Sequence, residues 1–287
     1  MKGIRLIGLL VMLGCSADKA SEKLFTDGHS LGQIDQRLKE ASGLVTSIIN
    51  PGLLWTLNDS GNPAEVFLID DHARIQLVCK LVNVRNRDWE DIAIGGGPEK
   101  GKNYLYVADI GDNQAQFDLK YIYRFEEPLW SKAKEQLITR IDTLVLRMPD
   151  GPRDAETLLI DPLTNDLFII SKREQFVGLY HAPYPFASDT LLLNKVLTIP
   201  MTQIVSGCIS ADGQEVLLKD YDHIHYWKRS EKESLAQLLA RKPIELPYVR
   251  EPQGEAIGWS RDGTAFYTLS ESTKEKNADL IVYRRGK

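Results

Sequence analysis

A short motif recurs about every fifty residues, and this repeat constrains the fold more than any other feature of the chain. In three copies a carboxylate enters a short apolar run, at Asp88–Ile94, Asp154–Ile160 and Gln253–Trp259. Two more copies, Ala41–Val45 and Val205–Ile209, lack the acid but keep the frame. Such a period is typical of propellers and other arrays of repeated units. Five copies therefore predict one closed body, although 287 residues alone would suggest about two domains.

Strand and turn signals divide each unit into four short strands. In the first unit, residues 43–82 hold four apolar runs separated by turn residues such as Asn50-Pro51-Gly52. Later units repeat this order, with a helical insertion predicted at Trp130–Leu137 and a helix predicted at Ser230–Arg241, capped by Ser230. The pattern predicts an all-β fold, a five-bladed β-propeller of four-stranded antiparallel blades. A six-bladed ring is the alternative, but the sequence shows five copies of the motif.

The last unit lacks its fourth strand. Gln33–Lys39 precedes the first motif just as the fourth strands of the other units precede the next motif. We therefore expect an N-terminal strand to complete the last blade, which ties the two ends of the ring together and removes exposed sheet edges. The predicted organisation is a signal peptide at residues 1–15, a flexible tether at residues 16–28 and a single propeller domain at residues 29–287.

The first residues have the features of an export signal. Lys2 and Arg5 precede a short apolar run, Leu6–Leu13, which is too short to span a bilayer, and Cys15 follows it. The pattern is similar to a bacterial lipoprotein signal, in which the cysteine becomes the lipidated N-terminus. A plain secretory signal is the alternative. The lipoprotein interpretation places the protein in the bacterial cell envelope, attached to a membrane through a lipid on Cys15.

Charge and residue content argue against several classes of function. With 35 Lys and Arg against 40 Asp and Glu, the net charge is -5, so no nucleic-acid partner is expected. Cys79 and Cys208 fall in predicted outer and inner strands that should lie far apart, so no disulfide framework is expected. His223 and His225 alternate along a predicted strand and share one face, but without a third ligand they do not predict a zinc site. Ser42 has no histidine partner in a recognisable hydrolase motif.

Polar residues gather at one mouth of the predicted central channel, which the innermost strand of each blade should line. Loops that enter these strands bring five residues to the axis: Ser42, Glu90, Glu156, Ser206 and Glu255. Loops after the second strands bring further charged residues to the same face: Asp59, Asp109, Asp112, Lys172 and Arg173. The opposite face receives mostly ordinary turn residues, such as Asp212-Gly213. This asymmetry is the strongest functional signal in the sequence.

Three glutamates that converge on one axis repel one another unless their pKa values rise or a cation neutralises them. Oxygen ligands without histidine or cysteine favour a hard ion, and Ca²⁺ suits a wide ring better than Mg²⁺. We therefore predict an axial Ca²⁺ bound by Ser42, Glu90, Glu156, Ser206 and Glu255. The alternative is that each carboxylate only caps a backbone turn. Trp89 could stack on a ligand or pack between blades.

The order Ser, Glu, Glu, Ser, Glu resembles that of the calcium-activated nucleotidases (apyrases), which are five-bladed propellers with an axial Ca²⁺. Leu57–Gly61 is similar to the acidic turn that follows the second strand in that family. Ser171–Arg173 falls where the family has a basic pair, and Gly254–Ile257 resembles its final Gly-Ile-Glu segment. Asp109–Asn113 instead resembles the acidic loops of the broader calcium-binding esterase-like and phytase-like propellers. The resemblance implies Ca²⁺ as the cofactor and a hydrolytic activity.

Two functions remain as hypotheses. In the first, the protein hydrolyses a phosphate-containing small molecule, and the ion polarises a phosphoryl oxygen or orients the attacking water. Asp59, Asp109 or Asp112 would act as base, while Lys172 and Arg173 would stabilise negative charge. In the second, the ion only holds the blades together, and the axial face binds a small molecule, a carbohydrate, a peptide or another protein. The sequence leaves open whether the protein is an enzyme.

Overall fold

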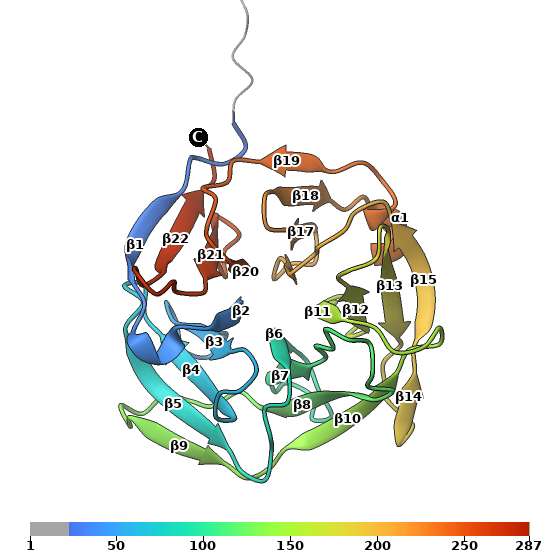
Figure 1. Cartoon of the computed structure of the whole chain (residues 1–287), viewed down its shortest axis with the longest axis horizontal. Coiled ribbons are helices and arrows are strands. Elements are labelled where there is room, and N and C mark those ends of the chain that lie inside the picture. The colour runs from blue at the N-terminus through green and yellow to red at the C-terminus, as the bar shows by residue number, and fades with distance from the viewer. Residues whose placement is uncertain (1–22, 287) are drawn as a thin grey trace, which may run out of the picture.

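The computed structural model describes residues 23–286 as five blades around one axis (Figure 1). From the axis outward, the first two blades comprise β2 (Ala41–Thr46), β3 (Leu54–Asn58), β4 (Glu65–Ile69) and β5 (Ile75–Leu81), then β6 (Trp89–Gly95), β7 (Tyr104–Asp109), β8 (Lys120–Glu126) and β10 (Asp142–Arg147). The next two comprise β11 (Ala155–Ile160), β12 (Leu167–Ser171), β13 (Val177–Ala182) and β15 (Asn194–Ile199), then β16 (Ser206–Ile209), β17 (Glu215–Lys219), β18 (Ile224–Lys228) and β19 (Ile244–Leu246). The fifth comprises β20 (Gly254–Trp259), β21 (Ala265–Ser270), β22 (Asp279–Arg284) and β1 (His29–Gln33). The predicted all-β, five-bladed propeller is confirmed.

Two blades carry a fifth, outer strand that the sequence did not predict. β9 (Glu135–Ile138) runs parallel to β5, and β14 (Thr190–Leu192) runs parallel to β10. The helical insertion predicted at Trp130–Leu137 is therefore wrong. The edge of β5 offers unpaired backbone groups, and pairing with them satisfies more of this segment's backbone than a short isolated helix would.

The N-terminal strand closes the ring, a few residues earlier than predicted. β1 pairs with β22 in antiparallel register, from His29 opposite Val282 to Gln33 opposite Asp279. The predicted strand at residues 33–39 instead contains a 3₁₀ helix, η1 (Gln36–Leu38), because the Asp35 side chain caps its first turn.

The segment ahead of β1 also packs on the ring. Within the predicted tether, Phe25 is fully buried and forms an isolated bridge with Arg285. The packed body therefore begins before residue 29. Residues 1–22, with the predicted signal peptide and Cys15, lie outside the described residues.

The connector before β19 contains one short helix, α1 (Leu235–Leu239), within the range predicted as helical. Its cap is Ser234 rather than Ser230. Ser234 accepts from the backbone of Gln237, and the Gln237 side chain accepts from the backbone of Ser234, a reciprocal capping box. The leucines of this helix pack into the apolar cluster between the third and fourth blades.

Five apolar clusters, one between each pair of neighbouring blades, hold the ring together. Trp89 is fully buried in the cluster between the first two blades, so it packs between blades instead of facing a ligand. Cys79 and Cys208 are both free thiols. Because the apolar side chains lie between the blades, the ends of the innermost strands are left to carry the polar residues.

Candidate functional site at the axial mouth

Three β-bulges at equivalent positions bring the three predicted glutamates together. The register between the two innermost strands shifts at Glu90 in β6, at Glu156 in β11 and at Glu255 in β20. A bulge leaves one residue unpaired and redirects its side chain. In the first blade the bulge position is Gly43, with φ +68°, and in the fourth blade the innermost pair has no such shift. Ser42 nevertheless occupies the position of Glu90, because Ala41 and Leu44 pair as Trp89 and Ile92 do. Ser206 takes the position of Trp89, since the fourth blade lacks the extra residue.

Carboxylates from three blades meet at this mouth, which we call the acidic mouth. Carboxylate oxygens of Asp59, Asp88 and Glu90 lie within 4.8 Å of one another, as do those of Glu90, Asp154 and Glu156. Glu90 and Glu156 are each 4% exposed, and Glu156 Oε2 has no hydrogen-bond partner among the described residues. Buried polar atoms are normally paired, so this arrangement calls for a proton or a cation.

Lys172 provides a positive charge inside the acidic mouth. Its ammonium group donates to Glu156, donates at 2.9 Å to the Tyr221 hydroxyl and lies 3.9 Å from Glu255 Oε1. Tyr221 donates to the same Glu255 oxygen at 2.5 Å. These contacts connect the third, fourth and fifth blades. When ionised, Glu90, Glu156 and Glu255 carry three negative charges against the single charge of Lys172, a formal excess of two.

Burial and mutual repulsion raise the pKa values of four acids at this mouth, Glu90, Glu156, Asp59 and Glu271. Burial is the main cause for Glu90 and Glu156, and both pKa values lie well above the usual range for glutamate. The neighbouring charge of Lys172 opposes this rise at Glu156. Burial, with nearby carboxylates, raises the pKa of Asp59 to about 6 and that of Glu271, which follows β21, to about 8. Perturbed carboxylates gathered in one place are a common property of functional sites.

The hydroxyls of the two predicted serine ligands bond to protein atoms. Ser42 Oγ donates to the backbone carbonyl of Glu90, and Ser206 Oγ donates to Asp91 Oδ1 at 3.4 Å. The buried Asp91 also accepts from the backbone N–H of Leu158 at 2.9 Å. Ser42 thus connects the neighbouring strands β2 and β6, whereas Ser206 connects β16 with β6, two blades away. Their part in metal binding stays a prediction.

The three aspartates predicted as possible bases differ in their surroundings. Arg87 Nε lies 3.2 Å from Asp109 Oδ1, and the buried Lys120 lies 3.0 Å from Asp112 Oδ2. Asp112 also accepts two backbone N–H groups of its own loop, each at 2.8 Å. Asp59 forms no ion pair within the described part of the chain and is only partly buried. Its carboxylate is therefore the most available of the three.

The predicted basic pair divides between two environments. Lys172 is buried among the axial glutamates, whereas the Arg173 side chain is 44% exposed and donates to Asp154 and Asn113. Arg173 therefore remains accessible from solvent at the rim of the acidic mouth.

A cavity of about 220 Å³ opens at the other mouth of the channel, away from the carboxylates. It is enclosed by the far ends of the innermost strands, and Arg261 is the one charged residue in its described lining. Each blade contributes a residue there: Thr46, Ile94, Ile160, Ile209 and Trp259. The cavity and the cluster of carboxylates thus lie at opposite ends of the channel. We place the chemistry at the acidic mouth, because carboxylates converge there whereas the cavity has a single charged residue in its described lining.

The sequence matches no protein-family model and no curated protein. The resemblance to the calcium-activated nucleotidases therefore rests on the order of the motifs, and the structure adds the five-bladed ring. No helix within residues 23–286 is long and apolar enough to cross a membrane.

Four residues at the mouth were not predicted from the sequence. Asp88 and Asp154 each lie two positions before a bulge glutamate, so the repeated Asp-x-Glu could have revealed them. Asp91 could have been found as an acid inside an apolar innermost strand. Tyr221 lies in the loop after a second strand, which the sequence places at this face, but its role depends on contacts with two other blades.

Proposed function

We propose that the acidic mouth binds one Ca²⁺ through Glu90, Glu156 and Glu255, with Asp59 and Asp88 beside them. The observation that carries this proposal is a buried, unpartnered Glu156 oxygen within a trio of glutamates whose formal charge exceeds that of Lys172 by two. A divalent ion would balance that excess. The donors are all oxygens, which favours Ca²⁺ over softer metals.

The activity that best fits this site is Ca²⁺-dependent hydrolysis of a phosphate-containing small molecule. A mouth with excess negative charge repels phosphate, so binding of such a substrate would require the cation. Bound Ca²⁺ would polarise a phosphoryl oxygen or orient the attacking water. Asp59 is the best base of the three candidates, because its pKa of about 6 lies close to neutral pH and its carboxylate is not ion-paired. Arg173, at the rim, would hold the phosphate oxygens.

A second candidate function is a non-catalytic binding module that uses the ion as a structural link. The contacts from Lys172 through Tyr221 to Glu255 favour this alternative, because they already join three blades at the place where an ion would bind. The axial face would then hold a carbohydrate or another small molecule through its loops.

Thermal unfolding with Ca²⁺ and with chelator tests the metal site. A melting temperature that changes with neither Ca²⁺ nor chelator would refute the metal site. Hydrolysis of nucleotides, sugar phosphates and lactones, with and without Ca²⁺, then separates the two functions. Ca²⁺-dependent turnover that Asp59→Asn abolishes supports the enzyme, whereas stabilisation without turnover supports the binding module.

We also propose a lipid-anchored position in the bacterial cell envelope, with Cys15 as the lipidated residue. The proposal is supported by the charged and apolar pattern that precedes this cysteine. It is independent of the metal site, because either function could be carried out by a propeller attached to a membrane surface.

A further inference from the structure

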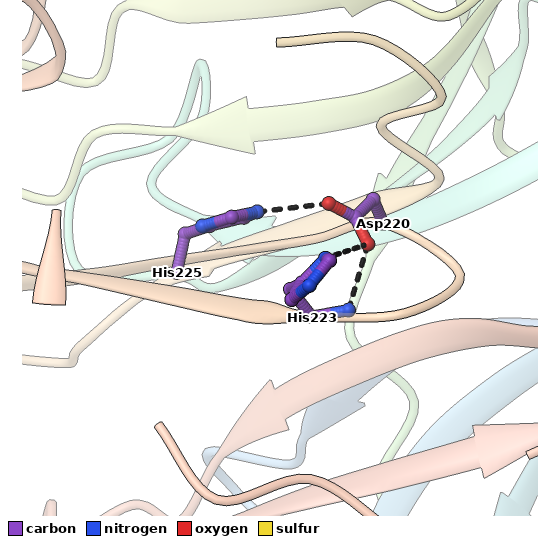
Figure 2. Close-up of side chains that lie close together, drawn as sticks. All are labelled: Asp220, His223 and His225. Carbon is purple, nitrogen blue, oxygen red and sulfur yellow. Dashed lines mark hydrogen bonds and ion pairs between the residues drawn. The ribbon is translucent and has the colours of Figure 1, made fainter. Parts of the chain in front are cut away.

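The hairpin between β17 and β18 brings two histidines onto one carboxylate (Figure 2). His225 Nε2 lies 2.9 Å from Asp220 Oδ2, and His223 Nδ1 lies 3.2 Å from Asp220 Oδ1. The imidazole rings are 5.8 Å apart between centroids. Asp220 thus supplies the third donor that the alternating histidines lacked in the sequence, because a turn of four residues folds it back over the strand.

The three donor atoms are already close to the spacing that a small metal ion requires. All three lie within 4.8 Å of one another. In a tetrahedral site with metal–ligand distances of about 2.0–2.1 Å, neighbouring ligand atoms are about 3.3 Å apart. Each imidazole nitrogen lies near that distance from its own carboxylate oxygen, and one donor atom from each residue lies within 4.8 Å of the others. Side-chain adjustment within the turn would bring the three donors onto one ion.

Backbone contacts orient the shared carboxylate. Asp220 Oδ1 accepts the N–H groups of Asp222 and His223, both at 2.7 Å. Groups that orient a metal ligand in this way raise affinity, because less freedom is lost on binding. His225 and Asp220 are largely buried, whereas the His223 side chain is 47% exposed, which leaves one side of the group open to solvent.

Another pair in the same protein shows what an ordinary histidine–aspartate contact looks like. His181 Nε2 also lies 2.9 Å from a carboxylate oxygen, Asp166 Oδ2, but a single imidazole faces that carboxylate. The His181 ring stacks on Phe168, with centroids 4.6 Å apart. At Asp220, by contrast, each carboxylate oxygen has its own imidazole. Two imidazoles and one carboxylate therefore converge at Asp220, whereas His181 is alone with its carboxylate.

We propose that Asp220, His223 and His225 bind Zn²⁺. Two imidazoles and one carboxylate match zinc, whereas the all-oxygen acidic mouth matches Ca²⁺. Three protein ligands with an open fourth position are the donor count of zinc sites that accept water or a further ligand. This site is separate from the proposed function at the axis, since none of its ligands belongs to the axial set.

Zn²⁺ titration of the tag-free protein by calorimetry tests the proposal. Loss of a group that merely orients a ligand costs about 10–100-fold in affinity, so His223→Gln with His225→Gln should weaken the site by at least that factor. His181→Gln is the matched control, and Glu156→Gln reports on the axial acids; both should bind Zn²⁺ like the wild type. Co²⁺ should give the visible absorption of a four-coordinate site in the wild type and lose it in the double variant.

Three results would overturn the proposal: a wild type that binds no Zn²⁺, a double variant that binds it as tightly as the wild type, or a control variant that loses it equally. Circular dichroism and melting temperature without metal verify that the double variant is folded. If it is not folded, His223→Gln alone is decisive, because this half-exposed side chain can be replaced without disturbing the core.

Discussion

Replacing Lys172 by methionine separates a metal centre from a set of ordinary ion pairs. In the folded protein Lys172 donates to the buried Glu156 and lies 3.9 Å from Glu255. Methionine keeps much of the apolar chain but removes the ammonium group that lies within 4 Å of both glutamates. Removing one partner of a buried pair costs about 3–5 kcal/mol. In chelator we expect the free energy of unfolding of this variant to fall by at most that amount, because protonation of Glu156 would offset part of the loss.

Ca²⁺ should then stabilise the Lys172→Met variant more than the wild type, because three glutamates face the ion without a competing ammonium group. At a hundredfold excess of Ca²⁺ over its Kd, the wild type gains about 2.7 kcal/mol. Each tenfold rise in affinity adds about 1.4 kcal/mol. Glu156→Gln should act in the opposite direction, since a tenfold loss of affinity reduces the gain to about 1.4 kcal/mol at the same concentration.

Urea unfolding in Ca²⁺ and in chelator measures both gains. Lys120→Met is the matched control, because Lys120 is equally buried and pairs with Asp112 at 3.0 Å but contacts none of the axial glutamates. It should lower stability by a similar amount in both solutions and leave the Ca²⁺ gain unchanged. Equal gains in all four proteins would refute the metal site. A smaller gain in Lys172→Met than in the wild type would refute the competition between ammonium and ion.

Three further predictions concern pH, ring closure and export. In chelator, the free energy of unfolding should fall as pH rises from about 4 to about 8. The reason is that the raised pKa values of Asp59 (3.8 to about 6) and Glu271 (4.5 to about 8) make the folded state hold more protons than the unfolded state. Urea titrations across this pH range should show a smaller fall when Ca²⁺ is present. Deleting residues 29–39 should lower the melting temperature of the whole ring in one transition, because β22 loses its partner strand; melting at the wild-type temperature would contradict this closure. Cys15→Ser should abolish labelling by a radioactive fatty acid, and a wild type that takes up no label would contradict the lipoprotein signal.

The ring could be predicted from the sequence because its innermost strands repeat both an apolar run and an acid at the entrance. Segments at the outer edge carried no such repeat. Glu135–Ile138 has mostly exposed side chains, so its pairing with β5 depends on backbone groups that no hydrophobic pattern reveals. The closing strand was placed too late for a similar reason, since the turn at Asp35 and the short helix after it are local features.

At the site, residues that share one position in the repeat could be predicted, and contacts between blades could not. Glu90, Glu156 and Glu255 meet because equivalent bulges recur in three blades. The position of Lys172 depends on how its long side chain crosses to a neighbouring blade, and a sequence motif holds no information on that path. The predicted role of Lys172 in binding an anion therefore has to account for its contact with Glu156.

The contrast between compensated and uncompensated acids supports a ligand at the axis. Other buried acids of this propeller are compensated within the protein. Lys120 pairs with Asp112 and Arg229 pairs with Asp161 at 2.8 Å, while Asp91 and Glu127 accept several hydrogen bonds. The acidic mouth departs from this rule, since Glu90 lies among carboxylates and forms no ion pair within residues 23–286. A fold that compensates its buried acids elsewhere carries a repulsive group here at a cost to its own stability, and a proton or a cation must relieve it. The opposite responses expected of Lys172→Met and Glu156→Gln to Ca²⁺ therefore test whether the missing charge is a metal ion.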